Sequence, residues 1–417
     1  MLRTLFPRTH RKYLSLSLLG PIADGFDDWL VGNGFTQGSR KFCIRMLLHV
    51  DADLRLRRIG KVAELTRSVL HDCWGTFIKS LPRHAGTVRS LERYLVASGL
   101  VVNGRNEPAT LPSPPRILIE EYVSHLLEVR GSAASTIYHH RFTAQCFLEQ
   151  LEKTGIALKD SRPSNVEAYI ANAGKRLSRA SLQHEIGALR GFLRFLAMDG
   201  RAPHDLARQI DTPRLYRREQ LPRALPWDTV CALLRSIDTT TAMGKRDYAI
   251  FLLIATYGLR ASEVVALTLD DIRWRQGSLR IDQRKTSSPL ELPLTNEVLS
   301  ALVKHLKRTP TPAPYRRVFL RMRAPIGVLK PTAVTEAFQA LVRKSGLAIS
   351  FQGPHCLRHS YAVHLLKNGT PLKTIGDILG HRTAESTSMY LRLATGDLRE
   401  VALAVPGRRL CGKEGRR

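Results

Sequence analysis

Two proline-rich or basic stretches interrupt the helical periodicity of this chain. The first is NEPATLPSPPR at residues 106–116, and the second is DTPRLYRREQLPRALP at residues 211–226. Proline lacks the backbone N–H that a helix uses and disfavours helical geometry in the residue before it, so both stretches are typical of linkers. The pattern predicts an additional N-terminal helical domain at residues 1–110, a helical domain at 111–205, a linker at 206–225, a third domain at 226–400 and a basic C-terminal tail at 401–417.

The first two segments share a pattern of apolar spacing. In each, an apolar-periodic helix leads to a glycine, Gly34 or Gly131, and a Ser/Thr-rich start then opens a second helix. Each segment also closes on a similar helix, SLERYLVASG up to Gly99 and LRGFLRFLAMDG up to Gly200. Sequence identity between the segments is low, so an internal duplication and two unrelated helical bundles both remain open.

The third segment mixes helices with a little β-structure. Apolar spacing predicts helices at residues 226–237, 245–257, 296–307, 332–344, 354–367 and 372–379. The stretches GSLRID and LELPL alternate like strands around the turn-like QRKTSSP. We therefore expect a mostly α-helical domain with a small antiparallel β-sheet.

The charge of the chain favours a polyanionic partner. Lys and Arg total 64 against 36 Asp and Glu, which gives a formal net charge of +28. An excess of this size is typical of nucleic-acid-binding proteins. It also suits a ribosomal or membrane-surface protein, so the motifs must decide between these classes.

The cysteines and apolar runs indicate a cytoplasmic protein. The six cysteines lie far apart and form no CxxC pair of the zinc-knuckle or redox kind. The longest apolar runs, such as YAIFLLIATYGL, fall short of the roughly 20 residues that a membrane span needs. The basic N-terminus lacks the small-residue cleavage site of an export signal.

The stretch GPHCLRHSYAVHLL gathers imidazole and guanidinium groups on one predicted helix. His355 and Arg358 are three residues apart and face the same way, whereas Leu357, Tyr361 and Leu365 lie on another face. The apolar face can anchor the helix in a core, which would hold the polar face still. Alone, such a helix would suit a basic surface equally well.

Metal binding by this helix is not expected. His355 and His359 have the i,i+4 spacing of a zinc-binding helix, but HCLRH lacks the glutamate of HExxH. It carries Arg358 between the two histidines instead, and a guanidinium beside a divalent cation is repulsive.

Two further motifs complete a recognisable set: TYGLRASEVVALTLDDI lies upstream and LGHRTAESTSMYLR downstream. Five residues resemble, in order and spacing, the active-site signature of the tyrosine recombinases, the phage-integrase family: Arg260 in GLRxSE, His355 and Arg358 in HxLRH, His381 in LGH, and Tyr390. The resemblance covers roughly residues 115–400. It implies the family fold, with a helical core-binding domain followed by the catalytic domain, forming a C-shaped clamp on double-stranded DNA.

The chemistry implied by the resemblance fits these residue types. Arg260 and Arg358 would clamp the oxygens of a DNA phosphate, and Tyr390 would attack the phosphorus to form a 3′-phosphotyrosine ester. A free tyrosine has a pKa of about 10, so the positive field and the histidines must favour its phenolate. Tyr257 ends an apolar helix and Tyr361 lies on an apolar stripe, which indicates core positions for both. Tyr390 instead follows RTAESTSM, which we interpret as a loop that could place it at the cleft.

The family also uses a lysine on a β-hairpin turn to protonate the leaving 5′-oxygen. The turn in LRIDQRKTSSPLEL offers Arg284 and Lys285, and lysine has the lower and more tunable pKa. We therefore assign Lys285 to this role. Glu263 is expected to orient Arg260 through a salt bridge.

By resemblance, the protein is a site-specific DNA recombinase of the integrase or transposon type, without metal or other cofactor. The family works as a homotetramer on synapsed sites, in some cases with companion recombinases. A type IB topoisomerase would use the same chemistry, and a catalytically silent DNA-binding regulator would keep only the fold.

The recombinase resemblance does not need residues 20–105. Apolar helices such as FDDWLVGNG and SLERYLVASG predict a folded module there rather than a disordered basic arm. If it is a duplicated DNA-binding bundle, we expect Arg55, Arg57, Arg58 and Lys61 to neutralise additional phosphates.

Overall fold

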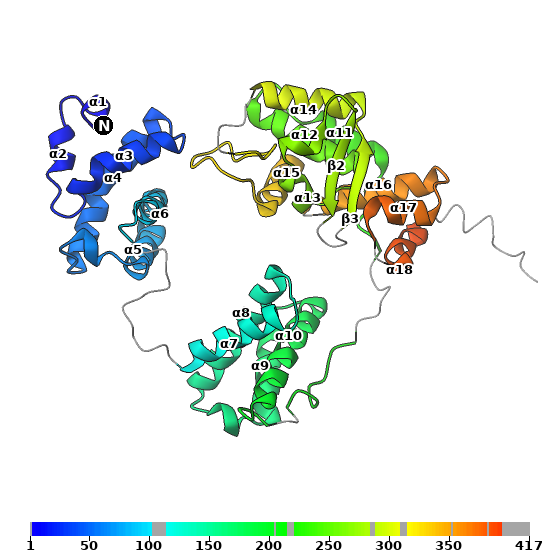
Figure 1. The fold of residues 1–417 in the computed structure, drawn as a ribbon, viewed down its shortest axis with the longest axis horizontal. Coiled ribbons are helices and arrows are strands. Elements are labelled where there is room, and N and C mark those ends of the chain that lie inside the picture. The colour runs from blue at the N-terminus through cyan, green and yellow to red at the C-terminus, as the bar shows by residue number, and fades with distance from the viewer. Residues whose placement is uncertain are drawn as a thin grey trace, which may run out of the picture. The chain divides into compact units, whose positions relative to one another are not determined.

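The structure is a computed structural model of the chain. It describes residues 2–101, 114–203, 206–214, 221–283, 288–308, 315–351, 353–381 and 383–393. The chain divides into two compact units, one of residues 99–219 and one of residues 1–98 together with 220–417. Figure 1 colours the ribbon along the chain. In the part that the structure describes, no helix combines the length and apolarity of a membrane span.

The N-terminal residues fold into short and long helices around an apolar core. They are α1 (Leu2–Leu5), α2 (His10–Leu14), α3 (Ala23–Gly32), α4 (Gln37–Leu56), α5 (Arg67–Ser80) and α6 (Pro82–Ala97), with 3-10 turns η1 (Gly20–Ile22) and η2 (Val62–Glu64). Thr36 caps α4 by accepting a hydrogen bond from the Ser39 amide, and Thr66 caps α5 through the Val69 amide. Over their described part these residues are mostly helical, and apolar side chains such as Phe26, Ile44 and Leu91 are fully buried.

The middle unit is a helical bundle. It comprises α7 (Pro114–Glu128), α8 (Ala134–Lys153), η3 (Leu158–Asp160), α9 (Pro163–Gly174) and α10 (Arg179–Met198). Phe147, Leu189 and Phe192 are fully buried in its core. One expectation is wrong here, because α7 already begins at Pro114, inside the stretch predicted as a linker. Proline fits the first turn of a helix, where its missing N–H has no partner to lose.

The C-terminal residues are mostly helical, as predicted. The helices are α11 (Trp227–Arg235), α12 (Ala242–Tyr257), α13 (Ala261–Ala266), α14 (Asn296–Arg308), α15 (Pro331–Ser345), α16 (His355–Lys367), α17 (Leu372–Leu379) and α18 (Ala384–Ser388), with η4 (Leu269–Asp271) and η5 (Met389–Leu393). Helix α12 is buried over most of its length and packs against α11, α13, α14, α15 and α16 (Figure 1). It is the centre of this core.

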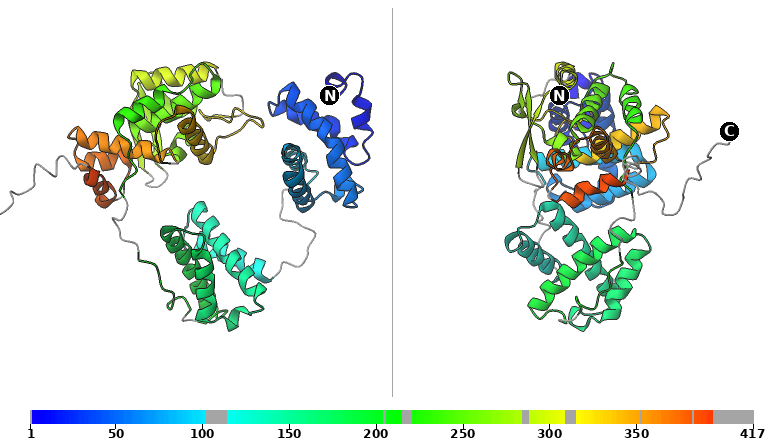
Figure 2. Two further views of the ribbon diagram at one scale, coloured as in Figure 1. Left: turned by 180° about the vertical axis from the view of Figure 1, so that it is seen from behind. Right: turned by 90° about the vertical axis from the view of Figure 1, so that its right-hand side faces the viewer.

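The small antiparallel sheet is also present. Strands β1 (Ile272–Arg273), β2 (Ser278–Gln283) and β3 (Ser288–Pro293) pair in that order, with Leu279 opposite Leu292 and Ile281 opposite Leu290. In the side view of Figure 2 the hairpin stands at one edge of the C-terminal helices. The sequence predicted β2 and β3 but not β1, which is too short to show a period. The mostly α fold with a small antiparallel sheet is confirmed.

The segment before Tyr390 differs from expectation. We interpreted RTAESTSM as a loop, but Ala384–Ser388 forms α18 and Met389–Leu393 continues as η5. Helix α18 packs on α17, and its Thr387 is buried. Tertiary packing thus overrides the weak helix propensity of serine and threonine.

Candidate active site

Arg260 is fixed at the start of α13. Its side-chain Nη1 donates to Glu263 Oε1 at 2.6 Å, and its backbone amide donates to Glu263 Oε2 at 2.8 Å. Glu263 is only 4% exposed. The expected salt bridge is therefore present, and a buried carboxylate holds the guanidinium in one orientation.

The turn that leads into Arg260 requires a glycine. Helix α12 ends at Gly258 with a left-handed φ of 64°. A Cβ atom there would lie 2.6 Å from Leu379 Cδ2 and 2.8 Å from Tyr361 Cδ1. Both the backbone conformation and the packing against α16 and α17 exclude a larger residue.

Arg358 projects from α16 into the same place. Its side chain is buried and donates from Nη1 to the Gly258 carbonyl and from Nη2 to the Leu379 carbonyl. Arg260 Nη2 in turn lies 3.4 Å from the carbonyl oxygen of Gly380. The two guanidinium groups thus bind consecutive carbonyls at the end of α17.

Two cations held together in a buried site favour an anion between them. Burial and the neighbouring Arg260 lower the pKa of Arg358 to about 10, so it remains charged at neutral pH. Guanidinium groups have five N–H donors each, and the contacts described occupy only some of them. The site can therefore donate to the non-bridging oxygens of a phosphate.

Tyr390 lies on η5 with its ring buried, and its hydroxyl is 3.0 Å from Nδ1 of His359. Burial raises the pKa of this hydroxyl, whereas Arg358 and Arg260 lower it. The two arginines thus favour the phenolate against the cost of desolvation.

His359 was absent from the residues predicted for the site. The signal was present in its i,i+4 spacing from His355, which we considered only for metal binding. The two rings meet edge to face with centroids 4.5 Å apart. Burial, followed by the nearby His355, lowers the pKa of His359 to about 4, so its ring is neutral at pH 7 and can accept the Tyr390 proton in a hydrogen bond.

His381 follows the end of α17 and faces the same tyrosine. Its ring is nearly parallel to that of Tyr390, at 15° with 6.3 Å between centroids. Its Nδ1 lies 2.9 Å from the hydroxyl oxygen of Thr387, which leaves Nε2 outside this bond. Burial and then Arg358 lower the pKa of His381 to about 4. The sequence did not indicate the orienting contact from Thr387.

The structure brings four predicted residues into one connected group: Arg260, Arg358, His381 and Tyr390. His355 is exposed at the start of α16 and touches the group through His359. Lys285 lies outside the described residues.

Neither of the other two tyrosines competes with Tyr390 for the site. Tyr257 is buried, and its hydroxyl donates to the Pro293 carbonyl at 2.6 Å. Tyr361 packs beside Gly258. Over the described ranges, no three His, Cys, Asp or Glu side chains gather as a metal site would require.

Two family models match the chain. The phage integrase family matches residues 223–396, and the phage integrase N-terminal SAM-like domain matches residues 119–200. The first match includes every residue of the group described above.

The chain is similar to three curated relatives, and each match covers most of the relative's length. The putative integrase/recombinase y4rA of Sinorhizobium fredii is 35% identical over 298 residues, covering 71% of this chain and 72% of that protein. The putative integrase/recombinase y4rF of the same organism is 29% identical over 404 residues, or 95% and 93% of the two chains. Tyrosine recombinase XerD of Listeria monocytogenes is 30% identical over 298 residues, or 68% of this chain and 96% of its own.

Solved structures share the fold at low identity. An integrase of the Tn1549 transposon, in complex with a circular intermediate DNA, gives a TM-score of 0.53 at 16% identity over 68% of this chain and 99% of that one. The XerH site-specific recombinase bound to its difH substrate, in a post-cleavage complex, gives 0.52 at 18% identity over 68% and 83%.

Proposed function

This chain belongs to the phage integrase family of tyrosine recombinases, and on that premise we propose that it cleaves and rejoins DNA at specific sites with Tyr390 as nucleophile. One observation carries the assignment of the nucleophile. The Tyr390 hydroxyl is hydrogen-bonded to a neutral histidine in a buried site that also holds two arginines. This arrangement suits attack by a phenol on an anionic phosphodiester.

Arg260 and Arg358 supply the positive charge in this mechanism. In-line attack on the phosphorus builds negative charge on the non-bridging oxygens, and fixed guanidinium donors stabilise it without reorganisation. Glu263 and the carbonyls at the end of α17 hold both groups in place before DNA binds. These arginines take the part that a metal ion plays in other phosphoryl-transfer sites, so we propose no metal cofactor.

The histidines serve the tyrosine and the phosphate. His359 accepts the hydrogen bond of the Tyr390 hydroxyl and so positions it. We assign two roles to the other histidines, hydrogen bonding to the scissile phosphate and acceptance of the proton that the phenol releases. The two histidines are His381, which Thr387 orients, and His355 at the exposed end of α16. The Tyr390 oxygen bonds to phosphorus as the bond to the 5′-oxygen breaks. The 5′-hydroxyl of a partner strand later attacks this ester and releases Tyr390.

We propose Lys285 as the acid that protonates the leaving 5′-oxygen. Lys285→Ala should slow cleavage of ordinary DNA by about 10²- to 10⁴-fold, the usual contribution of general acid catalysis. On a substrate whose leaving oxygen is replaced by sulfur, the rate should recover, because a thiolate departs without a proton. The measurement is the rate of covalent adduct formation on both substrates.

Arg284→Ala provides the matched control for this pair of substrates. It removes the cation that directly precedes Lys285 in the sequence, so we expect a modest loss that is equal on oxygen and sulfur. Failure of Lys285→Ala to recover on the sulfur substrate would assign the acid to another residue.

Complete exchange requires more than one protomer. We propose a homotetramer on two synapsed DNA sites, with a four-way junction as intermediate, or a mixed assembly with companion recombinases. A type IB topoisomerase would instead relax one plasmid without a partner site, and a silent regulator would bind without forming an adduct.

Plasmid assays in excess chelator separate these functions. The target site is first identified by crosslinking the protein to genomic DNA and sequencing the bound fragments. On a plasmid with two copies of that site, we expect recombinant products even in the presence of EDTA, because the arginines supply the charge. Relaxation with a single site and no recombinants would favour the topoisomerase. Activity lost under EDTA and restored by Mg²⁺ would contradict the mechanism.

A further inference from the structure

Residues 34–58 and 131–155 follow the same backbone course, 97 positions apart. Gly34 and Gly131 open the two segments with left-handed φ values of 75° and 55°. Helices α4 and α8 then begin 97 positions apart, and each runs for 20 residues.

The two helices also end alike. The Ile59 amide donates to the Leu54 carbonyl at 3.2 Å, and the Ile156 amide donates to the Leu151 carbonyl at 3.1 Å. Four pairs of buried residues keep the same separation: Leu47 and Ala144, Val50 and Phe147, Asp51 and Leu148, and Leu54 and Leu151.

Helices α6 and α10 correspond in the same way at a separation of 101. Both are followed by glycines with left-handed φ, Gly99 at 70° and Gly200 at 63°. Buried pairs are Ala85 and Ile186, Val88 and Leu189, Leu91 and Phe192, Tyr94 and Phe195, and Leu95 and Leu196. Agreement of the glycine turns and of the buried positions, together with the equal lengths of α4 and α8, favours an internal duplication over two unrelated bundles. We call residues 20–101 the first copy and residues 114–203 the second.

The copies differ in charge where α4 and α8 end. Three positions lose or reverse charge between the copies: Arg55 corresponds to Glu152, Arg58 to Gly155, and Lys61, before η2, to Ala157, before η3. The three basic side chains of the first copy are all exposed. The corresponding stretch of the second copy also holds two exposed lysines, Lys153 and Lys159, but Glu152 and Asp160 balance them. The shared backbone thus carries a turn with a net positive charge in one copy only.

Arg58 is held in an unfavourable backbone conformation. Its φ is 64°, and it is the only residue other than glycine with positive φ in the described part of the chain. The corresponding Gly155 adopts φ of 66°, which costs glycine nothing. An arginine kept at a position that favours glycine indicates a function for its side chain.

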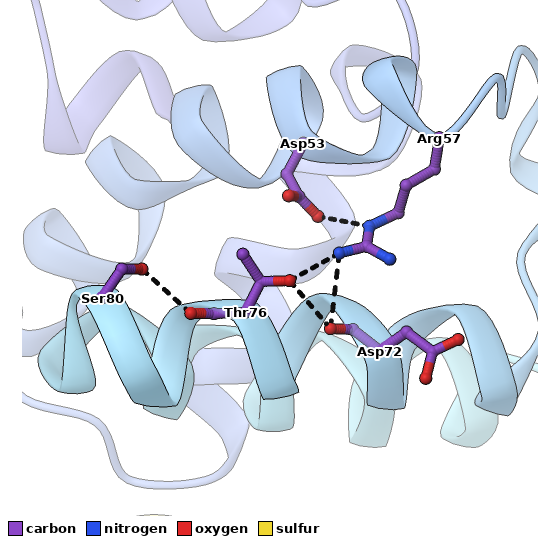
Figure 3. Close-up of polar contacts among 5 residues, drawn as sticks. All are labelled: Asp53, Arg57, Asp72, Thr76 and Ser80. Carbon is purple, nitrogen blue, oxygen red and sulfur yellow. Dashed lines mark hydrogen bonds and ion pairs between the residues drawn. The ribbon is translucent and has the colours of Figure 1, made fainter.

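Arg57 has a different role from its neighbours. Its Nε donates to Asp53 Oδ2 at 2.7 Å, and its Nη2 donates to Thr76 Oγ1 at 2.6 Å and to the Asp72 carbonyl at 3.4 Å (Figure 3). Figure 3 shows the guanidinium bridging the end of α4 to α5. The earlier expectation that Arg57 binds phosphate is therefore replaced by a structural role.

The acidic residues of this region do not offset its basic surface. Residues 2–101 contain 16 Lys and Arg against 8 Asp and Glu. Buried Asp27 is paired with Arg40, and buried Asp51 accepts hydrogen bonds from the Leu18 and Leu19 amides. These two carboxylates serve the interior. Glu64 is exposed beside Lys61 and accepts hydrogen bonds from the Gly60 and Lys61 amides, so it offsets part of the local charge, but the twofold excess of Lys and Arg leaves the outer field positive.

We infer that Arg55, Arg58 and Lys61, the basic turn of the first copy, bind the phosphate backbone of duplex DNA beyond the segment that is cleaved. This rests on the proposed function, which makes DNA the substrate. Phosphate contacts of this kind add affinity and fix register without reading base sequence.

The test is the salt dependence of binding by the full-length protein to a fluorescent 60-bp duplex of random sequence. Each phosphate contact contributes about 0.9 to the slope of log K against log salt. Arg58→Gly should lower the slope by about one unit, and Arg55→Ala, Arg58→Gly and Lys61→Ala together by about two to three. Glycine suits the backbone at residue 58, so the melting temperature of the single variant should be unchanged or higher.

Two variants are matched controls. Lys79→Ala removes an exposed cation from the last turn of α5 and should keep the wild-type slope. Arg57→Ala should lower the melting temperature through the contacts of Figure 3 while the slope stays the same. A wild-type slope for both Arg58→Gly and the triple variant would overturn the inference. Adduct formation on a target site is measured separately. A wild-type protein that binds DNA but forms no adduct would contradict the proposed function and leave the inference about the basic turn standing.

Discussion

Tyr390→Phe is expected to reduce covalent attachment to DNA below detection, with DNA affinity within about twofold of wild type. The variant lacks the oxygen that bonds to phosphorus, whereas a single hydroxyl contributes little to an interface dominated by phosphate contacts. The measurement is adduct formation on a target-site duplex, beside a binding titration at the same salt concentration.

The tyrosine variant also carries a structural consequence. His359 Nδ1 loses the partner that lies 3.0 Å away. An unsatisfied polar atom costs about 1–3 kcal/mol when it is fully buried, and His359 is half-buried, so we expect the variant to lose stability toward the lower end of this range. Its stability should therefore be measured before activity is compared. His359→Ala is the companion variant and should slow attachment without abolishing it. Any adduct from Tyr390→Phe would show that another residue is the nucleophile.

Arg358→Ala should lose both cleavage and stability. Removing one preorganised donor from the developing charge costs about 10²- to 10³-fold in rate, and Arg358 presents several. The carbonyls of Gly258 and Leu379 would also lose their donor, at about 1–3 kcal/mol for each buried group. Single-turnover cleavage at saturating protein and thermal unfolding measure the two effects separately.

Two controls separate the lost charge from the lost fold. Arg358→Lys keeps a cation but cannot reproduce the fork that reaches two carbonyls, so cleavage should remain low. Arg246 is also buried, and it contacts Asp247 at 2.9 Å and the Leu320 carbonyl at 3.4 Å. Arg246→Ala should destabilise the protein while cleavage at low temperature persists. Equal cleavage by Arg358→Ala and Arg246→Ala would contradict the phosphate clamp.

The sequence alone was sufficient for the longer helices of the C-terminal residues and for most residue types of the site. Helical periodicity is a local property, so α12, α14 and α15 appear within a few residues of their predicted bounds. The motifs GLRxSE, HxLRH and LGH are likewise local, and each predicted residue lies on or beside the helix that its motif indicated. The ion pair between Arg260 and Glu263 spans three residues and was predicted for the same reason.

The contacts that make these motifs one site depend on packing between distant segments. Arg260 and Gly380 are 120 positions apart, and His359 and Tyr390 are 31 apart, so no helical period relates them. The short helix α18, three of whose five residues are serine or threonine, packs on α17, and that packing brings Thr387 to His381.

The basic turn shows the same division between local and tertiary information. The sequence placed Arg55, Arg57 and Arg58 together, and composition alone treats them as equal charges. Only the fold brings Thr76 and the Asp72 carbonyl to Arg57 and holds Arg58 at positive φ. The sequence specifies which side chains are present. The contacts of each side chain depend on which helices pack together when apolar surface is buried.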